Sequence, residues 1–215
     1  MRRLPRRVRT VALTIGVLVA CGVATPAFAQ TVTLDVIDVE RIDDDLVGVR
    51  DGAPSLRIAL LKSERVLWIG SKGTVGVALT DRRFLAVSTT ASRWRELRLG
   101  REDANPRVWL GANLALCVTD RRVLPFAGGP GLIGETALFA TERVLSVEAS
   151  EHVGSVVTDR RALGFSSHST AAAERRFFVQ ETFESVRTRA TTSTVRTSQR
   201  LLIYKRSGGG WIEER

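Results

Sequence analysis

The residues of this sequence with the clearest chemical potential are paired arginines that close a repeated four-residue phrase. Thr80-Asp81-Arg82-Arg83 returns as Thr119-Asp120-Arg121-Arg122 and Thr158-Asp159-Arg160-Arg161, and in altered form as Thr197-Ser198-Gln199-Arg200. The same 39-residue interval separates each copy from the next. A guanidinium can form two parallel hydrogen bonds to a carboxylate or phosphate, so exposed members of this set could bind an anion. We expect Arg82, Arg121 and Arg160 to bind an anion in this way and to form a ring at one end of the molecule.

The other residues of the phrase suit a tight turn. Aspartate in a turn accepts hydrogen bonds from nearby backbone N–H groups. The last arginine persists in all four copies, even where the aspartate becomes Ser198, so we interpret it as the structural member of the pair. Repeated turns generally serve to build the repeat. The residues assigned to this structural turn are Thr80, Asp81, Arg83, Thr119, Asp120, Arg122, Thr158, Asp159, Arg161, Thr197 and Arg200.

The remaining reactive side chains predict no metal site, no cofactor and no catalytic centre. His152 and His168 are the only histidines, too few for a familiar zinc site, and we interpret both as surface turn residues. Cys117 occupies a repeat position that elsewhere holds Ala or Val, which places it in the core. The acidic stretch between residues 35 and 45 lacks the spacing of an EF-hand. We also find no acid pair that recurs on the strands, which weakens the case for a hydrolase or lyase.

Four tryptophans raise the alternative of a carbohydrate site, because flat aromatic faces suit sugar rings. When the chain is aligned with itself at an offset of two units, Trp68, Trp94 and Trp109 face Ser, Ala and Arg. No tryptophan therefore recurs in that alignment, whereas a lectin with one site per repeat should repeat its platform. We interpret the tryptophans as packing residues, with one unrepeated ligand site as the alternative.

The elements that carry these residues read as short strands. In the unit that starts at Arg65, strand-like runs cover residues 65–69, 74–80, 83–88 and 94–99, with turn residues between them. No stretch after the first thirty residues has a convincing helical period. Each 39-residue unit thus predicts four antiparallel strands, and the phrase lies in the turn between the second and third. A match of 64–67 with 142–145 suggests that the units alternate in pairs.

Both faces of the predicted strands are apolar. Val75, Val77 and Leu79 lie on one face of their strand, and Gly76 and Ala78 on the other. This pattern favours sheets stacked face to face, with small residues receiving larger ones from the neighbour.

Period and strand content resemble those of β-propeller tandem repeats, over about residues 31–215. The resemblance implies an all-β propeller of about five blades built from 39-residue four-stranded repeats. The tail at 211–213 could pair with the first mature strand to close the ring, although one strand is missing from the count, so the fifth blade could have three strands or the ring could be incomplete. Thr-x-x-Arg-Leu also occurs in pleckstrin-homology-type domains, but a 39-residue period without a closing helix fits them poorly.

Residues 1–29 have the layout of a secretory signal peptide. Five arginines precede an apolar run at 11–24 and the triplet Ala27-Phe28-Ala29, and we exclude this segment from the fold. Leu18-Val19-Ala20-Cys21-Gly22 also resembles a lipobox, so lipidation of Cys21 is the alternative to cleavage after Ala29. Cleavage would reduce the formal charge from +9 to 27 − 23 = +4. Nucleic-acid binding then loses its compositional support.

Together these patterns predict an exported, non-enzymatic binding or scaffolding protein of the bacterial cell envelope, periplasmic or extracellular. The expected partner is a protein or a glycan, and a membrane is involved only if Cys21 is lipidated. The alternative is an extracellular glycan-binding protein or a glycan-active hydrolase or lyase on the same scaffold. Propellers as a class bind ligands on loop faces or at the mouth of their channel, but the fold alone does not choose the ligand.

Overall fold

The computed structural model describes residues 36–207 and 209–215, which belong to one compact unit, Thr33–Arg215. The signal segment, the cleavage site and Cys21 lie outside the described residues. In the part of the chain that is described, no helix is long and apolar enough to cross a membrane.

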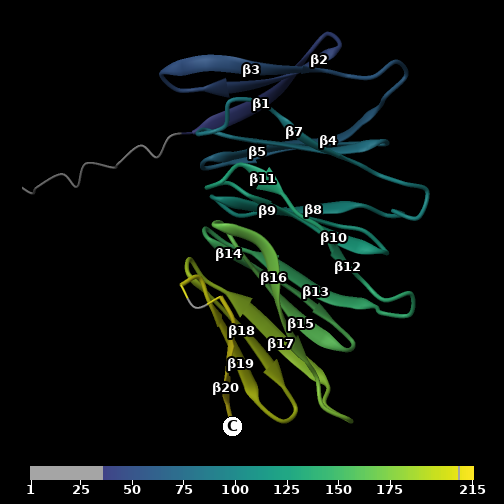
Figure 1. Cartoon of the computed structure of the whole chain (residues 1–215), viewed down its shortest axis with the longest axis vertical. Helices are drawn as coiled ribbons and strands as arrows, with labels where there is room; N and C mark the ends of the chain where they lie inside the picture. The colour runs from purple at the N-terminus through teal and green to yellow at the C-terminus, as the bar shows by residue number, and fades with distance from the viewer. Residues whose placement is uncertain (1–35, 208) are drawn as a thin grey trace, which may run out of the picture. The chain divides into compact units, whose positions relative to one another are not determined.

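Five antiparallel sheets follow one another along the chain, and each is built from one continuous segment (Figure 1). The first contains β1 (Ile37–Ile42), β2 (Asp45–Arg50) and β3 (Ala53–Ala59). The second contains β4 (Val66–Lys72), β5 (Val75–Thr80), β6 (Arg83–Ser88) and β7 (Arg95–Arg98). The third contains β8 (Arg107–Leu110), β9 (Leu114–Val118) and β10 (Arg122–Ala127), with the short strands β11 (Leu132–Ile133) and β12 (Thr136–Ala137) both paired to β10. The fourth contains β13 (Val144–Ala149), β14 (Val153–Thr158), β15 (Arg161–Ser166) and β16 (Ser169–Arg176), and the fifth β17 (Phe183–Thr188), β18 (Thr192–Thr197), β19 (Leu201–Lys205) and β20 (Trp211–Glu214).

The predicted all-β fold of about five four-stranded blades is confirmed, but two details of its ends differ. The tail strand β20 pairs with β19 of its own sheet, and β1 pairs with β2, so the tail does not pair with the described part of the first strand; residues 31–35 of that expected strand lie outside the described residues. Among the described residues the three-stranded sheet is the first, and the fifth has four strands. The spacing of the phrase established the period but could not tell which edge strand pairs with which.

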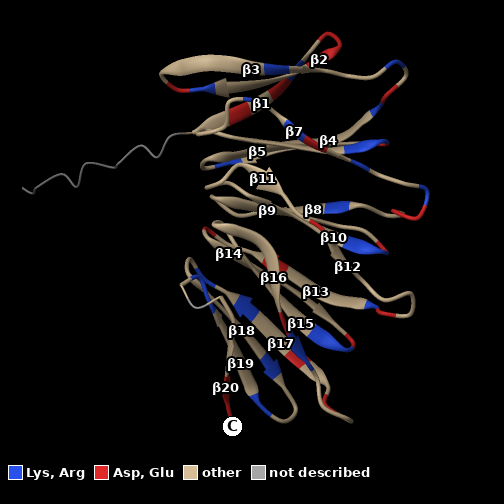
Figure 2. Cartoon of the chain, viewed as in Figure 1, with Lys and Arg blue, Asp and Glu red and all other residues tan. Residues whose placement is uncertain are grey.

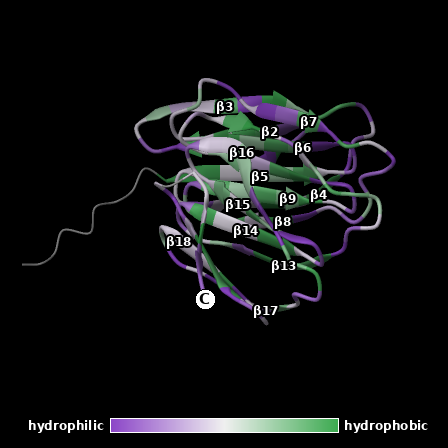
Figure 3. Cartoon of the chain, turned by 60° about the horizontal axis from the view of Figure 1, so that its bottom comes forward, coloured by the Kyte–Doolittle hydropathy of each residue, from purple (hydrophilic) through white to green (hydrophobic). Residues whose placement is uncertain are grey.

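The core lies between the sheets, because the central strands bury both of their faces. All six residues of β5, β6, β14 and β15 are buried. Separate clusters fill the successive interfaces; between the second and third sheets, for example, Val77 and Phe84 pack with Cys117 and Phe126. In Figure 3 hydrophobic residues are frequent along inner strands such as β5 and β9, and hydrophilic residues are frequent in the links.

Close approach of the sheets depends on small residues at particular positions. A Cβ atom added to Gly164 in the fourth sheet would lie 2.6 Å from the Tyr204 ring of the fifth. The expectation that small residues on one surface receive larger ones from the next sheet is met at this contact.

Backbone hydrogen bonds also join one sheet to the next. The N–H groups of Thr74, Asn113 and His152 donate to the carbonyls of Ala112, Glu151 and Ala190, at 2.8, 2.8 and 3.0 Å. Donors and acceptors both recur with the period of the phrase, so every one of these sheets stacks on its neighbour in the same register.

The strand order places two sets of connections at the same end of the sheets. One set comprises the turns between second and third strands, and the other the links between sheets at 60–65, 99–106, 138–143 and 177–182. We call this the turn-bearing end. Figure 2 shows basic and acidic residues along it, at the right of the view.

Candidate functional site

The threonine of the phrase organises each turn. Thr80 is buried, and its Oγ1 atom accepts hydrogen bonds from the N–H groups of Arg82 and Arg83, at 3.1 and 2.8 Å. The same hydroxyl contacts the Oε1 atom of Glu64 at 2.5 Å. The turns at Thr119, Thr158 and Thr197 repeat this arrangement of accepted N–H groups. The hydroxyl thus satisfies backbone groups that the tight turn would otherwise leave buried and unpaired.

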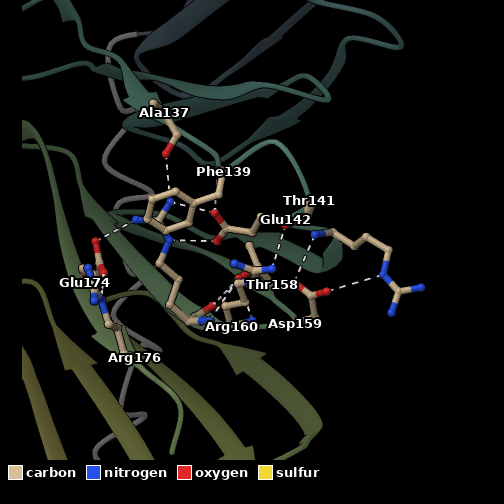
Figure 4. A network of polar contacts seen from close by, with 11 residues as sticks. Ala137, Phe139, Thr141, Glu142, Thr158, Asp159, Arg160, Glu174 and Arg176 are labelled. Carbon is tan, nitrogen blue, oxygen red and sulfur yellow. Dashed lines mark hydrogen bonds and ion pairs between the residues drawn. The ribbon is translucent and has the colours of Figure 1, made fainter.

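The second arginine of each turn is fully used inside the protein. The Nε and Nη2 atoms of Arg161 donate to the two carboxylate oxygens of Glu142, both at 2.8 Å. Figure 4 labels Glu142 and, near it, Phe139 and Ala137. Its Nη1 atom donates to Glu174 at 2.7 Å and Nη2 also to the carbonyl of Ala137 at 2.8 Å. The ring of Phe139 covers the guanidinium, 4.6 Å from its centroid to Cζ. This geometry assigns Arg161 to the turn's internal structure.

The other three sheets with the phrase repeat this network at constant sequence separations. One acid lies 19 residues before the arginine, a second lies 13 residues after it, and the carbonyl lies 24 residues before it. The corresponding partners are Glu64, Glu96 and Ala59 for Arg83; Asp103, Glu135 and Arg98 for Arg122; and Glu181, Glu213 and Arg176 for Arg200.

Sequence reasoning missed these acids because it looked for recurring acid pairs on the strands, whereas the inner acid of each network lies in the link. Both acidic positions are occupied in all four units, at 39-residue steps, and Asp103 fills one of them with a shorter side chain. The spacing alone could have revealed them. Matching the units only in pairs hid the repeat, because the segment around Asp103 differs from its neighbours.

Ion pairing keeps the inner carboxylates charged. Burial by itself would raise the pKa of Glu64, but hydrogen bonds from Arg83, Thr80 and the Leu61 N–H outweigh it and lower the pKa to about 2. The same opposing causes hold the pKa values of Asp103, Glu142 and Glu181 below the ordinary range. A carboxylate that stays ionised at neutral pH cannot serve as a general acid, so these four do not form the acid of a glycosidase.

The first arginine of each turn has the opposite environment. Arg82, Arg121 and Arg160 are exposed and follow one another along the turn-bearing end, one per sheet. The Nη2 atom of Arg160 donates to the Oγ1 atom of Thr141 at 2.7 Å. In the described part of the chain, neither Arg82 nor Arg121 forms an ion pair with a carboxylate. The fourth unit has Gln199 at this position.

The sequence of the third unit differs from that of the other units next to the Arg122 network. In the other three units, a large apolar residue lies in the link shortly before the inner acid, as Leu61, Phe139 and Phe178. The rings of Phe139 and Phe178 cover the arginines of their networks. The third unit has Gly100 at this position. The side chain of Arg122 is accordingly 16% exposed, against 1–5% for its three counterparts.

Three further departures follow in the same link. Asn105, in a left-handed conformation with φ of 51°, replaces the Val or Phe of the other units. It is flanked by Ala104 and Pro106, so β8 begins only at Arg107. The Nδ2 atom of Asn105 donates to Asp120 at 3.1 Å.

These changes border a cleft of about 830 Å³ between the third and fourth sheets. The side chains around it include Glu102, Arg107, Trp109, Asp120, Arg121 and Leu145. Of the three arginines predicted to bind an anion, Arg121 is therefore the one that also borders this cleft.

The tryptophans divide between packing and exposure. Trp94 and Trp211 bury their rings at the edges of the second and fifth sheets, and each donates its indole N–H to a carbonyl of the preceding sheet, at 3.0 and 2.9 Å. The two occupy the same repeat position three units apart, a recurrence that the alignment at an offset of two units could not reveal. Trp68 is 38% exposed, and Trp109 lines the cleft.

The cysteine and histidines offer no reactive centre. Burial raises the pKa of the Cys117 thiol to about 12. His152 is half-buried, and its Nδ1 atom lies 3.2 Å from the hydroxyl of Ser167. The exposed His168 contacts the guanidinium of Arg206. Among the described residues, no group of three or more His, Cys, Asp or Glu side chains could hold a metal ion.

No protein-family model and no curated protein matches the sequence. Solved structures of β-propeller proteins are similar to the chain in fold. The N-terminal domain of Nup159 has 11% identity and a TM-score of 0.36, over 85% of this chain and 61% of that one. Prp20p from Saccharomyces cerevisiae has 10% identity and a TM-score of 0.39, over 79% and 58%. YCF48 from Cyanidioschyzon merolae has 14% identity and a TM-score of 0.36, over 85% and 72%. This chain spans less than two thirds of the length of the first two.

Proposed function

We propose that this protein is an exported, non-enzymatic binding module of the bacterial cell envelope that holds a polyanionic partner at its turn-bearing end. The division of roles between neighbouring arginines carries this proposal. The second arginine of each turn is consumed by two carboxylates and a carbonyl, whereas Arg82 and Arg121 have no carboxylate partner among the described residues. The repeat therefore fixes one arginine internally and presents another to solvent.

The stacking suits a partner with repeated negative charges. Sheets packed face to face lie about 10 Å apart, so Arg82, Arg121 and Arg160 are presented at roughly that spacing. A single small anion could engage one of them, whereas a polymer of carboxylates, sulfates or phosphates could engage all three. An acidic glycan or an acidic protein segment has this chemistry. Export rests on the charged, apolar and small-residue layout of residues 1–29.

The ionisation state of the recurring inner carboxylates favours binding over catalysis. The inner carboxylate of each network is ionised and hydrogen-bonded to arginine. Neither a raised pKa nor a free lone pair is left in these groups for proton transfer.

The test compares two triple variants of equal charge. Arg82, Arg121 and Arg160 are replaced by Gln in one, and Arg93, Arg189 and Lys205, at the opposite end, in the other. Polygalacturonate and polyglutamate serve as probes, and binding is followed by calorimetry at several salt concentrations. We expect the first variant to weaken binding roughly 3- to 150-fold, since exposed ion pairs are worth about 0.2–1 kcal/mol each and three of them are lost, and the control to bind nearly as the parent does. Equal losses in both variants would show non-specific attraction and overturn the proposal.

A further inference from the structure

We propose that the cleft between the third and fourth sheets is a saccharide-binding site with Trp109 as its platform. It goes beyond the polyanion proposal, because it rests on the cleft and on a different ligand chemistry, although Arg121 borders both sites. The cleft has about 830 Å³ of space, within the range typical of small-molecule sites.

The cleft is made by a local break in an otherwise regular repeat. The fourth unit has an apolar cover, an arginine and an apolar strand residue at Phe139, Arg143 and Val144. The third unit has Gly100, Ala104 and Asn105 at these positions. The internal network of Arg122 nevertheless keeps both acids and its carbonyl. Within this link the changes at Ala104 and Asn105 border the cleft, while the residues that hold the turn together remain.

Trp109 is anchored and yet accessible. It lies on β8, packs against the apolar cluster between the third and fourth sheets, and lines the cleft. The equivalent positions in the other units are Gly70, Glu148 and Arg187, so the indole is a feature of this interface. A flat ring fixed by packing on one side offers its remaining surface to the apolar C–H face of a sugar at little conformational cost.

The polar groups of the cleft select a ligand that both donates and accepts hydrogen bonds. Arg107, Arg121 and Arg143 are donors, and Glu102 and Asp120 are acceptors, all exposed and all at the cleft. A simple anion would face the two carboxylates, and a simple cation would face the three guanidinium groups. Sugar hydroxyl groups donate and accept at once, so a neutral saccharide matches the full set.

The experiment observes the tryptophans individually. The protein is labelled with fluorotryptophan, and the fluorine resonances are assigned with single Trp→Phe variants. Cellotriose, maltotriose and chitotriose are each added at millimolar concentration. We expect at least one of them to shift the Trp109 resonance and leave that of Trp68 unchanged, because Trp68 is exposed but lies at the neighbouring interface. Binding should persist in high salt, unlike the attraction of a polyanion to surface arginines.

Two variants complete the test. Trp109→Ala should weaken binding at least about tenfold, as truncation of an aromatic anchor does, and Trp68→Ala should not. Ala104→Arg, Asn105→Val and Pro106→Leu together restore the residues of the fourth unit; this variant should fold stably and lose binding, even if Trp109→Ala fails to fold. An unshifted Trp109 resonance with all three sugars, or binding that survives the restored link, would overturn the inference. Either result leaves the polyanion proposal intact, and loss of polyanion binding would leave this one intact.

Discussion

Two adjacent arginines in one turn have opposite environments because only one of them can reach the inner carboxylates. Arg161 lies in β15, and its guanidinium bridges the link before the fourth sheet and the outer strand β16. Arg160 lies at the tip of the turn and is exposed. The same residue type therefore stabilises the sheet at one position and is available to a ligand at the next.

This contrast predicts a large difference between two single substitutions. Arg161→Ala leaves Glu142 buried without its cation, and loss of one member of a buried pair costs about 3–5 kcal/mol. We expect the melting temperature to fall by roughly 6–20 °C. Arg160→Ala, the matched control, should change it little, as surface substitutions usually do. Thermal unfolding followed by circular dichroism measures both, and equal effects would remove the structural assignment of Arg161.

The carboxylates predict how stability depends on pH. The pKa of Glu64 is lowered to about 2 in the folded state, whereas an unfolded glutamate titrates near pH ~4.3. A group with a lowered folded-state pKa contributes its stability above the unfolded value and loses it as pH falls toward the folded value. The pKa values of Asp103, Glu142 and Glu181 are lowered too. The free energy of unfolding should thus be nearly constant around neutral pH and decline from about pH 5 to pH 2.

Urea unfolding at a series of pH values measures this decline. Glu142→Gln should be less stable than the parent at neutral pH, and its stability should depend less on pH in the acid range. A parent protein with greatest stability near pH 3 would contradict the ion-pair account.

At the scale of elements, the links between sheets contribute the covers of the arginine networks. The Phe178 ring lies 3.7 Å from the Cζ atom of Arg200, and Phe139 covers Arg161 in the same way. Both rings are about half exposed. They are placed where they shield an ion pair from water on one side, which explains why large apolar residues recur at an otherwise polar end.

Removal of one cover should weaken its network. Phe139→Ala exposes the Arg161–Glu142 pair to water and removes the cation–π contact, for a loss of about 1 kcal/mol. Phe139→Leu is the matched variant, because Leu61 holds the corresponding position in the second unit; it keeps an apolar cover but not the cation–π contact, so it should lose less stability than the Ala variant. Chemical denaturation curves of the two variants measure the difference. A Leu variant as unstable as the Ala variant would indicate that the aromatic ring itself is needed.

Local sequence patterns predicted the elements better than their contacts. The 39-residue step, the strands and the turn at Thr80 follow from residues within one unit, where turn chemistry and alternation are readable. The acid at position 103 was missed because it contacts Arg122 across 19 residues and differs in length from Glu64. The cleft was missed for another reason. It lies between two sheets, so the effect of Gly100 and Asn105 can be recognised only when β13 of the next sheet is known to lie opposite them.

At the scale of the whole molecule, the described unit is stabilised by contacts between neighbouring sheets. Such a stack behaves approximately as a chain of units joined by nearest-neighbour interfaces. The third sheet is packed on both faces, by the clusters that include Val77 and Val156. The outer face of the fifth carries Thr192, Thr194 and Arg196, where the third has Leu114, Leu116 and Val118.

Native-state hydrogen exchange should therefore vary along the stack. We expect the slowest exchange in the central strands of the second, third and fourth sheets, each of which is packed on both faces, and faster exchange in the first and fifth sheets, which can open without disturbing two interfaces. Mass spectrometry of peptides from each sheet gives the comparison. A single exchange rate for all sheets would show that the stack opens only as a whole.

The backbone hydrogen bonds between sheets have a consequence for how such a chain can grow. Each inner sheet offers an acceptor to the sheet before it and a donor to the sheet after it, as at Ala112 and Asn113. A duplicated segment one repeat long would therefore already carry both the backbone donor and the backbone acceptor that join it to its neighbours. The number of sheets could thus change by whole units while these backbone junctions are kept, and the break at residues 100–106 shows that one unit can diverge while its neighbours keep the common pattern.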